Sequence, residues 1–294
     1  MKKISVVINT FNEEKNIRKA ILSVAWADEI VVCDMQSVDE TVKIAKSLGA
    51  KVVSYKQVNF VEPARNFAIS SATREWILIL DADEQVPETL VTRLKELVKK
   101  NISASYVEIP RKNIIFTKWI LHTGWWPDYQ IRFFKKGTVT WNNQIHNRPQ
   151  TKGDGLKLEA EGKWAIIHSN YASIGEYIER LNRYSKIQAE EILKSGYKFK
   201  MQDLFEKPVS EFLSRYFASQ GYQDGLHGLV LSLLQAFSFL IVYLKIWEKA
   251  GFTEQTLILS EFEKGTKIVS KDINYWLNQS KGGSLKQFLK IFKK

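Results

Sequence analysis

The sequence has few of the residues that mark disulfide-rich or zinc-binding proteins. Its 294 residues include one cysteine, Cys33, which lies in an apolar run, and four scattered histidines. One cysteine excludes an internal disulfide and favours an intracellular setting. The small number of cysteines and histidines argues against a structural zinc site. No repeat of about 20 to 50 residues and no low-complexity stretch is present, so neither a repeat array nor a disordered protein is expected.

Two nucleotide-binding signatures are also missing. No G-x-x-x-x-G-K-[ST] loop occurs, and no G-x-G-x-x-G follows the first apolar run. The first residues, "MKKISVVINTF", reach Asn9 and Thr10 too early for the apolar region of about 7 to 15 residues that a signal peptide needs. We therefore expect the first strand of the fold there, and a cytoplasmic active portion.

Positive charge is in excess, with 43 Lys and Arg against 32 Asp and Glu, a net charge of +11. Such a surface favours anionic partners: phosphates, nucleic acid or acidic lipid. A nucleic-acid-binding protein should interleave basic and exposed aromatic residues on one face, and it does not explain carboxylates at strand ends. We expect no nucleic-acid partner.

Apolar, β-rich runs alternate with helical patterns over the first third of the chain. Strands are expected at 4–8, 29–35, 50–55 and 75–80, and helices at 13–25, 37–49, 62–73 and 87–100. Ser37 stands three residues before Glu40, which predicts a capping box, and Gly49 predicts the end of that helix. The alternation predicts an α/β fold with a parallel sheet covered on both faces.

The rest of the chain predicts two further parts. Residues 111–200 hold many tryptophans among polar residues, and we expect mixed strands and loops that complete the catalytic domain begun by residues 1–110. Residues 201–294 are strongly apolar and predict a helical region.

Three carboxylates, Asp81, Asp83 and Glu84, stand where the fourth strand should end. One interpretation is a charge cluster that favours the dipole of the following helix, worth about 0.3 to 1 kcal/mol per residue. The other is a metal site, because two aspartates separated by one residue can direct oxygens at one divalent ion that keeps positions for water and phosphate. Ligands bind beyond the carboxyl ends of strands in open sheets of this kind.

Four motifs in order carry a resemblance. "VVINTFNEEKNI", "VVCDMQSVDET", "ARNFAI" and "LILDADE" resemble the nucleotide-sugar half of the inverting family 2 glycosyltransferases, which have the GT-A fold. The segments "GWWPDYQIRFFKKGTVTWNNQIHN" and "YQDGLHGLVLSLLQAFSFLIVYLKIWE" resemble the bacterial branch that adds glucose or a similar sugar to the inner core of lipopolysaccharide.

The resemblance implies a role for each matching residue. The nucleotide-sugar site would comprise Thr10, Phe11, Asn12, Glu13, Asp34, Arg65, Asp81, Ala82 and Asp83. Asp83 would be the main ligand of a divalent cation, Mg²⁺ or Mn²⁺, with Asp81 nearer the ribose. Two alternatives stay open: Asp34 as a turn residue, and Arg65 paired with Glu62 on a helix face.

A base for the acceptor hydroxyl is implied at Asp128, whose alternative is a turn after Pro127. The acceptor or the diphosphate would contact Trp126, Gln130, Arg132 and His146. The alternatives are a core position for the tryptophan and an exposed structural role for the histidine.

The implied reaction is direct displacement from a UDP-sugar, with UDP-glucose as the expected donor, to a lipopolysaccharide-core or related glycolipid acceptor. A polyprenyl-linked sugar or a protein is the alternative acceptor. An inactive nucleotide-sugar-binding or scaffold protein is the alternative from a different class.

Residues 229–244 form an uncharged run of about 24 Å as a helix, short of the roughly 30 Å of a bilayer core. The interpretations are a buried helix, a contact with a second copy of the chain, or a helix embedded in the membrane from one side. The final "SLKQFLKIFKK" combines an apolar face with lysines, a pattern typical of helices on anionic lipid. We therefore expect association with the cytoplasmic face of the inner membrane.

Overall fold

The computed structural model describes residues 3–57, 61–142, 148–254 and 259–279. The chain divides into two compact units. The sheet unit comprises Met1–Ile114 and Pro127–Asn170, and the helical unit comprises Ile115–Trp126 and Tyr171–Lys294. The functional division expected at residues 110 and 200 stays a prediction.

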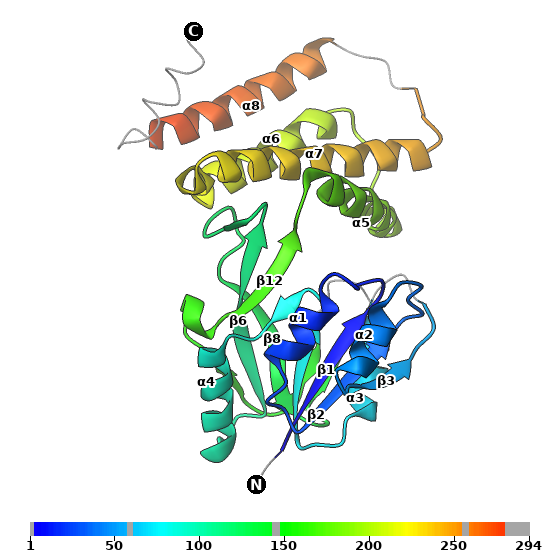
Figure 1. Ribbon diagram of the computed structural model, residues 1–294. Coiled ribbons are helices and arrows are strands. Elements are labelled where there is room, and N and C mark those ends of the chain that lie inside the picture. Colours follow the sequence, from blue (N-terminus) through cyan, green and yellow to red (C-terminus); the bar gives the residue numbers. More distant parts are fainter. Residues whose placement is uncertain (1–2, 58–60, 143–147, 255–258, 280–294) are drawn as a thin grey trace. The chain divides into compact units, whose positions relative to one another are not determined.

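The sheet unit is built on one large mixed sheet with the strand order β3-β2-β1-β4-β8-β6-β12-β5 (Figure 1). These strands are β1 (Ile4–Thr10), β2 (Glu29–Asp34), β3 (Lys51–Ser54), β4 (Trp76–Asp81), β5 (Glu84–Gln85), β6 (Tyr106–Ile115), β8 (Asp128–Lys135) and β12 (Ile166–Tyr171). Shorter strands are β7 (Lys118–Trp119), β9 (Val139–Thr140), β10 (Gln150–Thr151) and β11 (Gly155–Lys157).

The first four long strands form a parallel half of the sheet, as the sequence predicted. β1 lies parallel to both β2 and β4, and β2 lies parallel to β3. Beyond β4 the pairing changes, because β8 runs antiparallel to both β4 and β6. All seven residues of β1 are buried, as expected for a strand covered on both faces.

Helices cover both faces of this sheet. On one face lie α1 (Ile17–Ser23), α2 (Thr41–Ser47) and α4 (Glu88–Lys99), whose apolar residues join one core cluster with Ile8 and Leu80. On the other face, α3 (Glu62–Ser71) joins a second cluster with Val7 and Ile79. The alternation of β1 residues between the two clusters follows from the two-residue period of a strand. The predicted α/β class is confirmed.

The predicted capping box at Ser37 is wrong. Helix α2 begins at Thr41, four residues after Ser37. The Thr41 N–H donates to Asp39 Oδ1 at 3.0 Å and not to Ser37. The Ser37 hydroxyl instead accepts from the backbone N–H of Asn12 at 2.8 Å. The end of the helix is as predicted, since Gly49 has φ of 78°, where a side chain would be strained.

The helical unit contains a long helix that sequence analysis missed. α5 (Ile174–Lys194) occupies part of a segment expected to be strands and loops. Its start carries a capping motif, because the Ser173 side chain accepts from the Glu176 N–H at 3.1 Å. The buried residues Tyr177, Leu181, Ser185 and Ala189 recur every four positions, which is the period of one helix face.

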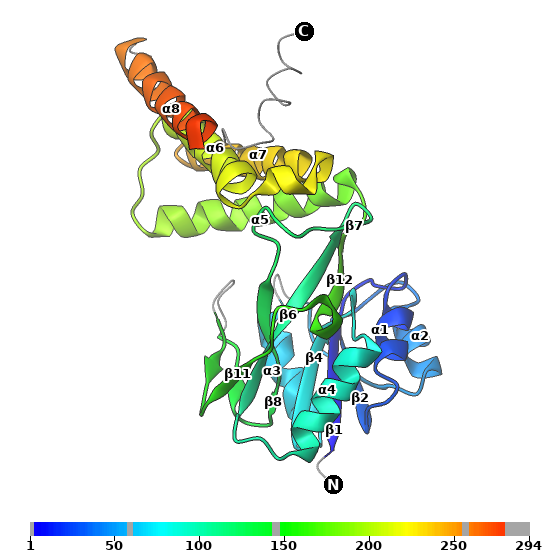
Figure 2. The same ribbon diagram turned by 90° about the vertical axis from the view of Figure 1, so that its left-hand side faces the viewer.

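The remaining helices follow in order. They are α6 (Asp203–Leu213), a π-helical turn (Ser214–Ala218), a 3₁₀ turn (Gly221–Asp224), α7 (Leu226–Lys249) and α8 (Leu259–Gln279). α7 packs against α5 and α6, and α8 packs against α6 (Figure 2).

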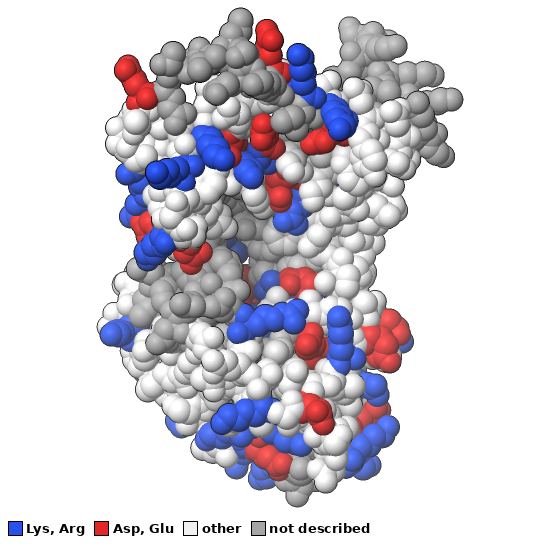
Figure 3. All heavy atoms as spheres, turned by 180° about the vertical axis from the view of Figure 1, so that it is seen from behind, with Lys and Arg blue, Asp and Glu red and all other residues white. Residues whose placement is uncertain are grey.

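α7 contains the apolar run of residues 229–244. This 24-residue helix contains an 18-residue stretch with a mean hydropathy of 2.1, so by length and composition it could cross a membrane. Core helices of soluble proteins have the same length and composition. Leu233 and Phe237 are exposed, at 52% and 44%. The segment 284–294 lies outside the described residues. Figure 3 shows basic and acidic side chains interspersed on the face drawn.

Candidate active site

Polar side chains gather on one side of the sheet where apolar strands would be expected. Asp128, Gln130 and Arg132 occupy alternate positions of β8, and Arg111 and Asn113 occupy alternate positions of β6. Alternate residues of a strand share a face. Each set therefore projects together, toward the loop that follows β4.

Asp81 ends β4 between two arginines. Its Oδ1 accepts from Arg65 Nη2 and its Oδ2 accepts from Arg132 Nη2, both at 2.6 Å. Burial opposes ionisation of Asp81, but the guanidinium groups of Arg132 and Arg65 outweigh it and lower the pKa of the carboxyl group. Arg65 thus pairs with Asp81; the side chain of Glu62, its alternative partner, lies outside the described part of the chain.

Glu84 is not a surface carboxylate but a fully buried one. Its Oε2 accepts the Asp81 N–H at 2.9 Å, and its Oε1 accepts from Arg132 Nη2 at 2.8 Å and Arg111 Nη1 at 3.3 Å. Glu84 lies in β5 and not in the first turn of α4, so it does not serve the helix dipole. Glu84 holds two arginines in place.

Asp128 lies at the start of β8 and accepts at both oxygens. Oδ2 accepts from Arg111 Nε at 2.7 Å and Asn113 Nδ2 at 3.0 Å, and Oδ1 accepts from Gln130 Nε2 at 2.8 Å. Burial acts to raise the pKa of Asp128, but Arg111, Asn113 and Gln130 together lower it. The carboxylate is therefore ionised and held in one orientation.

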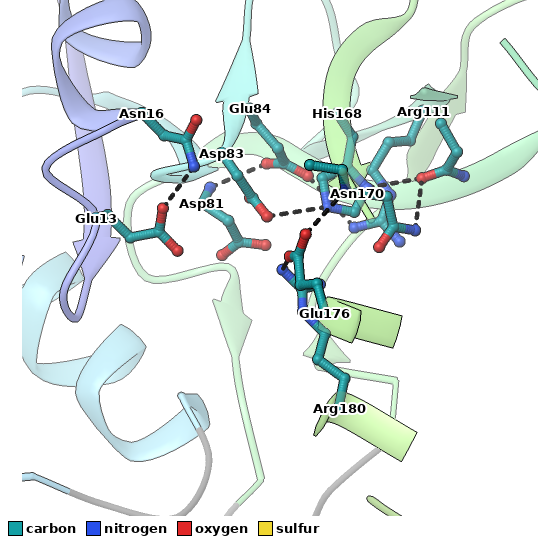
Figure 4. A network of polar contacts seen from close by, with 12 residues as sticks. Glu13, Asn16, Asp81, Asp83, Glu84, Arg111, His168, Asn170, Glu176 and Arg180 are labelled. Atoms are coloured by element: carbon teal, nitrogen blue, oxygen red, sulfur yellow. Dashed lines mark hydrogen bonds and ion pairs between the residues drawn. The ribbon is translucent and has the colours of Figure 1, made fainter. Parts of the chain in front are cut away.

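Asp83 joins this cluster through a histidine that sequence analysis did not select. His168 Nε2 is 3.3 Å from Asp83 Oδ2 (Figure 4). His168 Nδ1 is 2.6 Å from Asn113 Oδ1. Asn113 in turn contacts Asp128, so a chain of polar contacts runs from the D-x-D motif to Asp128. The pattern that could have revealed His168 and Asn113 is the recurrence of polar residues at alternate positions of "RKNII" and "IIHSNY".

The loop after β1 is held by the loop after β2. Asn12 has φ of 53°, and its Oδ1 accepts the Val38 N–H at 2.9 Å. The Asp34 carboxylate accepts the Ser37 N–H at 3.1 Å, so in this structure Asp34 acts as a turn residue. The Glu13 N–H donates to Thr41 Oγ1 at 2.8 Å. The nucleoside contacts expected of Thr10, Phe11, Asn12, Glu13 and Asp34 stay predictions.

Several buried polar atoms at this edge have no hydrogen-bond partner among the described residues. They are Nδ2 and Oδ1 of Asn9, Oγ1 of Thr10, Nε of Arg65 and Nε of Arg132. Unpaired buried polar groups are rare in native proteins and each costs about 1 to 3 kcal/mol. Asn9 and Thr10 lie at the carboxyl end of β1, and Arg65 and Arg132 pair with Asp81 at the end of β4. Unpaired polar atoms are expected where a polar ligand binds.

The predicted site residues not yet described are Ala82, Trp126 and His146. Ala82 is buried between the two aspartates. Trp126 belongs to the helical unit, where its ring meets that of Trp119 edge-on with centroids 5.0 Å apart. His146 lies outside the described residues.

A divalent cation would find two protein ligands here. Among the described residues no group of three or more His, Cys, Asp or Glu could hold a metal. Asp83 Oδ2 and His168 Nε2 are 3.3 Å apart, close to the roughly 3.0 Å between neighbouring ligands of an octahedral ion with bonds of about 2.1 Å. The pair fits an ion that takes its remaining ligands from phosphate and water. Asp81 fits less well, because both its oxygens already accept from guanidinium groups.

Two relatives that align with most of this chain are glycosyltransferases by name. An uncharacterized glycosyltransferase of Rickettsia typhi is 30% identical over 260 residues, which cover 84% of this chain and 88% of the relative. The lipopolysaccharide core biosynthesis glycosyltransferase LpsC of Rhizobium meliloti is 24% identical, covering 84% of this chain and 92% of the relative.

Among solved structures, glucosyl-3-phosphoglycerate synthase of Mycobacterium tuberculosis in complex with Mn²⁺ and UDP-glucose is 25% identical, with a TM-score of 0.33. That match covers 36% of this chain and 43% of the synthase, so this chain spans less than half of that enzyme's length. The family model for glycosyl transferase family 2 matches residues 5–152, which include β2, β3, β4 and β8 and helices α1 to α4. This match and the Rickettsia typhi relative show that the chain belongs to glycosyl transferase family 2.

Proposed function

We propose that this family 2 glycosyltransferase transfers a hexose, with glucose as the expected sugar, from a UDP-sugar to a lipopolysaccharide-core or related glycolipid acceptor. The transfer is a direct displacement that inverts the anomeric carbon. The observation that carries the proposal is the polar chain from Asp83 through His168 and Asn113 to Asp128. It links Asp83 and His168, the cation ligands that we propose, to the ionised Asp128 carboxylate.

The donor would bind at the carboxyl ends of β1 and β4. Asp83 and His168 would hold a divalent cation, Mg²⁺ or Mn²⁺, which offsets the negative charge of the diphosphate leaving group. The unpaired atoms of Asn9, Thr10 and Arg65 offer donors and acceptors to the nucleotide. Asp81, held between two arginines, would lie nearer the ribose.

Asp128 would accept the proton of the acceptor hydroxyl. As the new bond between that oxygen and the anomeric carbon forms, the bond from carbon to the diphosphate breaks and UDP leaves. The lowered pKa keeps Asp128 ionised at neutral pH, the form that a base needs. The proton moves late in the transfer, when bonding to the sugar has made the hydroxyl strongly acidic.

A lipid-linked acceptor is supported by the helical unit and by a relative. LpsC, named for lipopolysaccharide core biosynthesis, aligns with most of this chain. α7 exposes Leu233 and Phe237, and the chain carries a net charge of +11. Apolar exposure with excess positive charge favours an anionic membrane surface. We propose the cytoplasmic face of the inner membrane as the place where enzyme and acceptor meet.

The donor site is tested by titrating the protein with UDP, UDP-glucose and GDP-mannose, with and without Mn²⁺. We expect Mn²⁺-dependent binding of UDP and UDP-glucose that Asp83→Ala loses. Asp154→Ala, which replaces an exposed aspartate elsewhere in the sheet unit, serves as the matched control and should bind as the wild type does. Well-folded wild-type protein that binds no nucleotide would contradict the proposal.

The membrane proposal has its own test. We expect the protein to sediment with vesicles containing anionic lipid, and the double variant Leu233→Asp, Phe237→Asp to remain largely in solution. Equal sedimentation of the double variant and the wild type would show that this face of α7 does not contact the membrane.

A further inference from the structure

Asn113 lies fully buried on β6 between the two functional ends of the proposed site. Its Nδ2 donates to Asp128 Oδ2 at 3.0 Å, while its Oδ1 is 2.6 Å from His168 Nδ1. Asn170 Nδ2 also donates to the same Oδ1, at 3.5 Å. One amide therefore contacts the expected base and the expected metal-binding imidazole together.

The chemistry of these partners allows one arrangement of protons. An ionised carboxylate only accepts hydrogen bonds, so Asn113 must turn its NH₂ group toward Asp128. Its carbonyl oxygen then faces His168 and can only accept. His168 must therefore carry a proton on Nδ1, which leaves the Nε2 atom toward Asp83.

The contact between His168 Nε2 and Asp83 then requires a positive charge. With Nδ1 protonated, a neutral imidazole directs the Nε2 lone pair at the carboxylate oxygen 3.3 Å away, and two lone pairs repel. A divalent cation between the two atoms removes that repulsion. The cation is favoured where a diphosphate supplies its other ligands.

We propose that Asn113 is a positioning residue that fixes the His168 tautomer for metal binding and the orientation of the Asp128 carboxylate at the same time. The inference rests on the proposed function, since it assigns roles to His168 and Asp128 within that site. Asn113 itself touches neither sugar nor metal. It acts through a hydrogen bond on each side, as outer partners of metal-binding histidines do in other proteins.

The tautomer is measured first, on metal-free protein. Long-range ¹H–¹⁵N spectra of the histidine-labelled chain, assigned with His168→Gln, should show His168 protonated on Nδ1, either as the neutral Nδ1–H form or as the imidazolium. A neutral ring protonated on Nε2 would overturn the proposal. This measurement needs neither donor nor acceptor, so it stands even if the proposed activity fails.

Two variants separate the effects of the Asn113 hydrogen bonds to Asp128 and to His168. Asn113→Asp keeps an acceptor for His168 but puts a carboxylate against Asp128, so we expect Mn²⁺ affinity within about threefold of the wild type and a large loss of turnover. Asn113→Leu has nearly the same shape and loses both bonds, so Mn²⁺ affinity should fall about 10- to 100-fold. Affinity is measured by electron paramagnetic resonance in the presence of UDP.

The control is Asn182→Leu, which replaces an exposed asparagine of α5 and should change neither Mn²⁺ affinity nor turnover. Equal Mn²⁺ affinity in wild type and Asn113→Leu, or equal losses in the two Asn113 variants, would overturn the proposal. If circular dichroism shows that Asn113→Leu is unfolded, Asn113→Asp and the tautomer measurement still test the proposal. Absence of Mn²⁺ binding by the wild type itself would contradict the proposed function instead.

Discussion

The two halves of the sheet satisfy their polar side chains in different ways. In the parallel half, β1 ends with Asn9 and Thr10, whose buried side-chain atoms have no partner among the described residues. In the other half, Glu84 and Asp128 accept hydrogen bonds at every carboxylate oxygen. The end of β1 has donors and acceptors left for a ligand, whereas the two carboxylates of the other half are held in fixed positions before any ligand arrives.

This difference matches the tasks of the two halves in the proposed reaction. A nucleotide must bind and leave, so the groups that recognise it are unpaired without it, at a cost in stability. Charges that act on the reacting centre are most effective when they are already oriented, because no reorganisation is then needed during the reaction. Four substitutions or conditions test the comparison, from the largest expected effect to the smallest.

Asp128→Asn should lower turnover by about 10²- to 10⁴-fold, because the acceptor proton then has no positioned carboxylate to accept it. UDP affinity should stay within a few-fold, since Asp128 lies outside the parallel half. Turnover with UDP-glucose and UDP affinity by titration are measured together. A variant that loses nucleotide binding would show that the two halves are not separate.

Glu84→Gln should lower the free energy of unfolding by about 3 to 5 kcal/mol, because buried Arg132 and half-buried Arg111 lose a shared counter-charge. Urea unfolding measures the effect. The control is Glu96→Gln, which removes an exposed carboxylate 3.8 Å from Arg93 and should change stability by less than about 1 kcal/mol. Similar losses of unfolding free energy in both variants would mean that burying the contacts of Glu84 with the two arginines adds nothing to stability.

Acid should destabilise the fold through two ionised aspartates, Asp81 at the end of β4 and Asp128 at the start of β8. The lowered pKa values of Asp81 and Asp128 mean that their stabilisation is present above the unfolded value, roughly pH 4, and is lost as pH falls below it. Unfolding measured from about pH 6 down to pH 3 should show a steep loss that Asp81→Asn makes shallower. An identical slope in that variant would exclude Asp81 as a source.

Asn9→Val should raise the free energy of unfolding by about 1 to 3 kcal/mol while weakening UDP binding, because it removes an unpaired buried amide that we assign to the ligand. Ser5→Val on the same strand is the contrasting variant. The Ser5 hydroxyl donates to Glu29, so its removal should destabilise the protein and leave UDP binding unchanged. Destabilisation by Asn9→Val would show that the amide is satisfied in the folded protein.

Much of the parallel half could be predicted from the chain. The β-rich runs 4–8, 29–35 and 75–80 are strands in the structure, where they end at Thr10, Asp34 and Asp81. The helices between them lie where apolar residues recur at helical spacing. These patterns are local, since each depends on residues within one element. The pattern of the missed helix α5 is also local, because its capping residue and its four-residue period are visible in the sequence.

The sequence by itself determined the α/β class, the position of the D-x-D motif at a strand end and the family of the protein. Only the tertiary structure decided that Asp81 lies between two arginines, that Glu84 is buried, and that His168 faces Asp83. The physical reason is distance along the chain. Asn113 and His168 are 55 residues apart and meet because β6 and β12 are neighbours in the sheet, a pairing that no local pattern specifies.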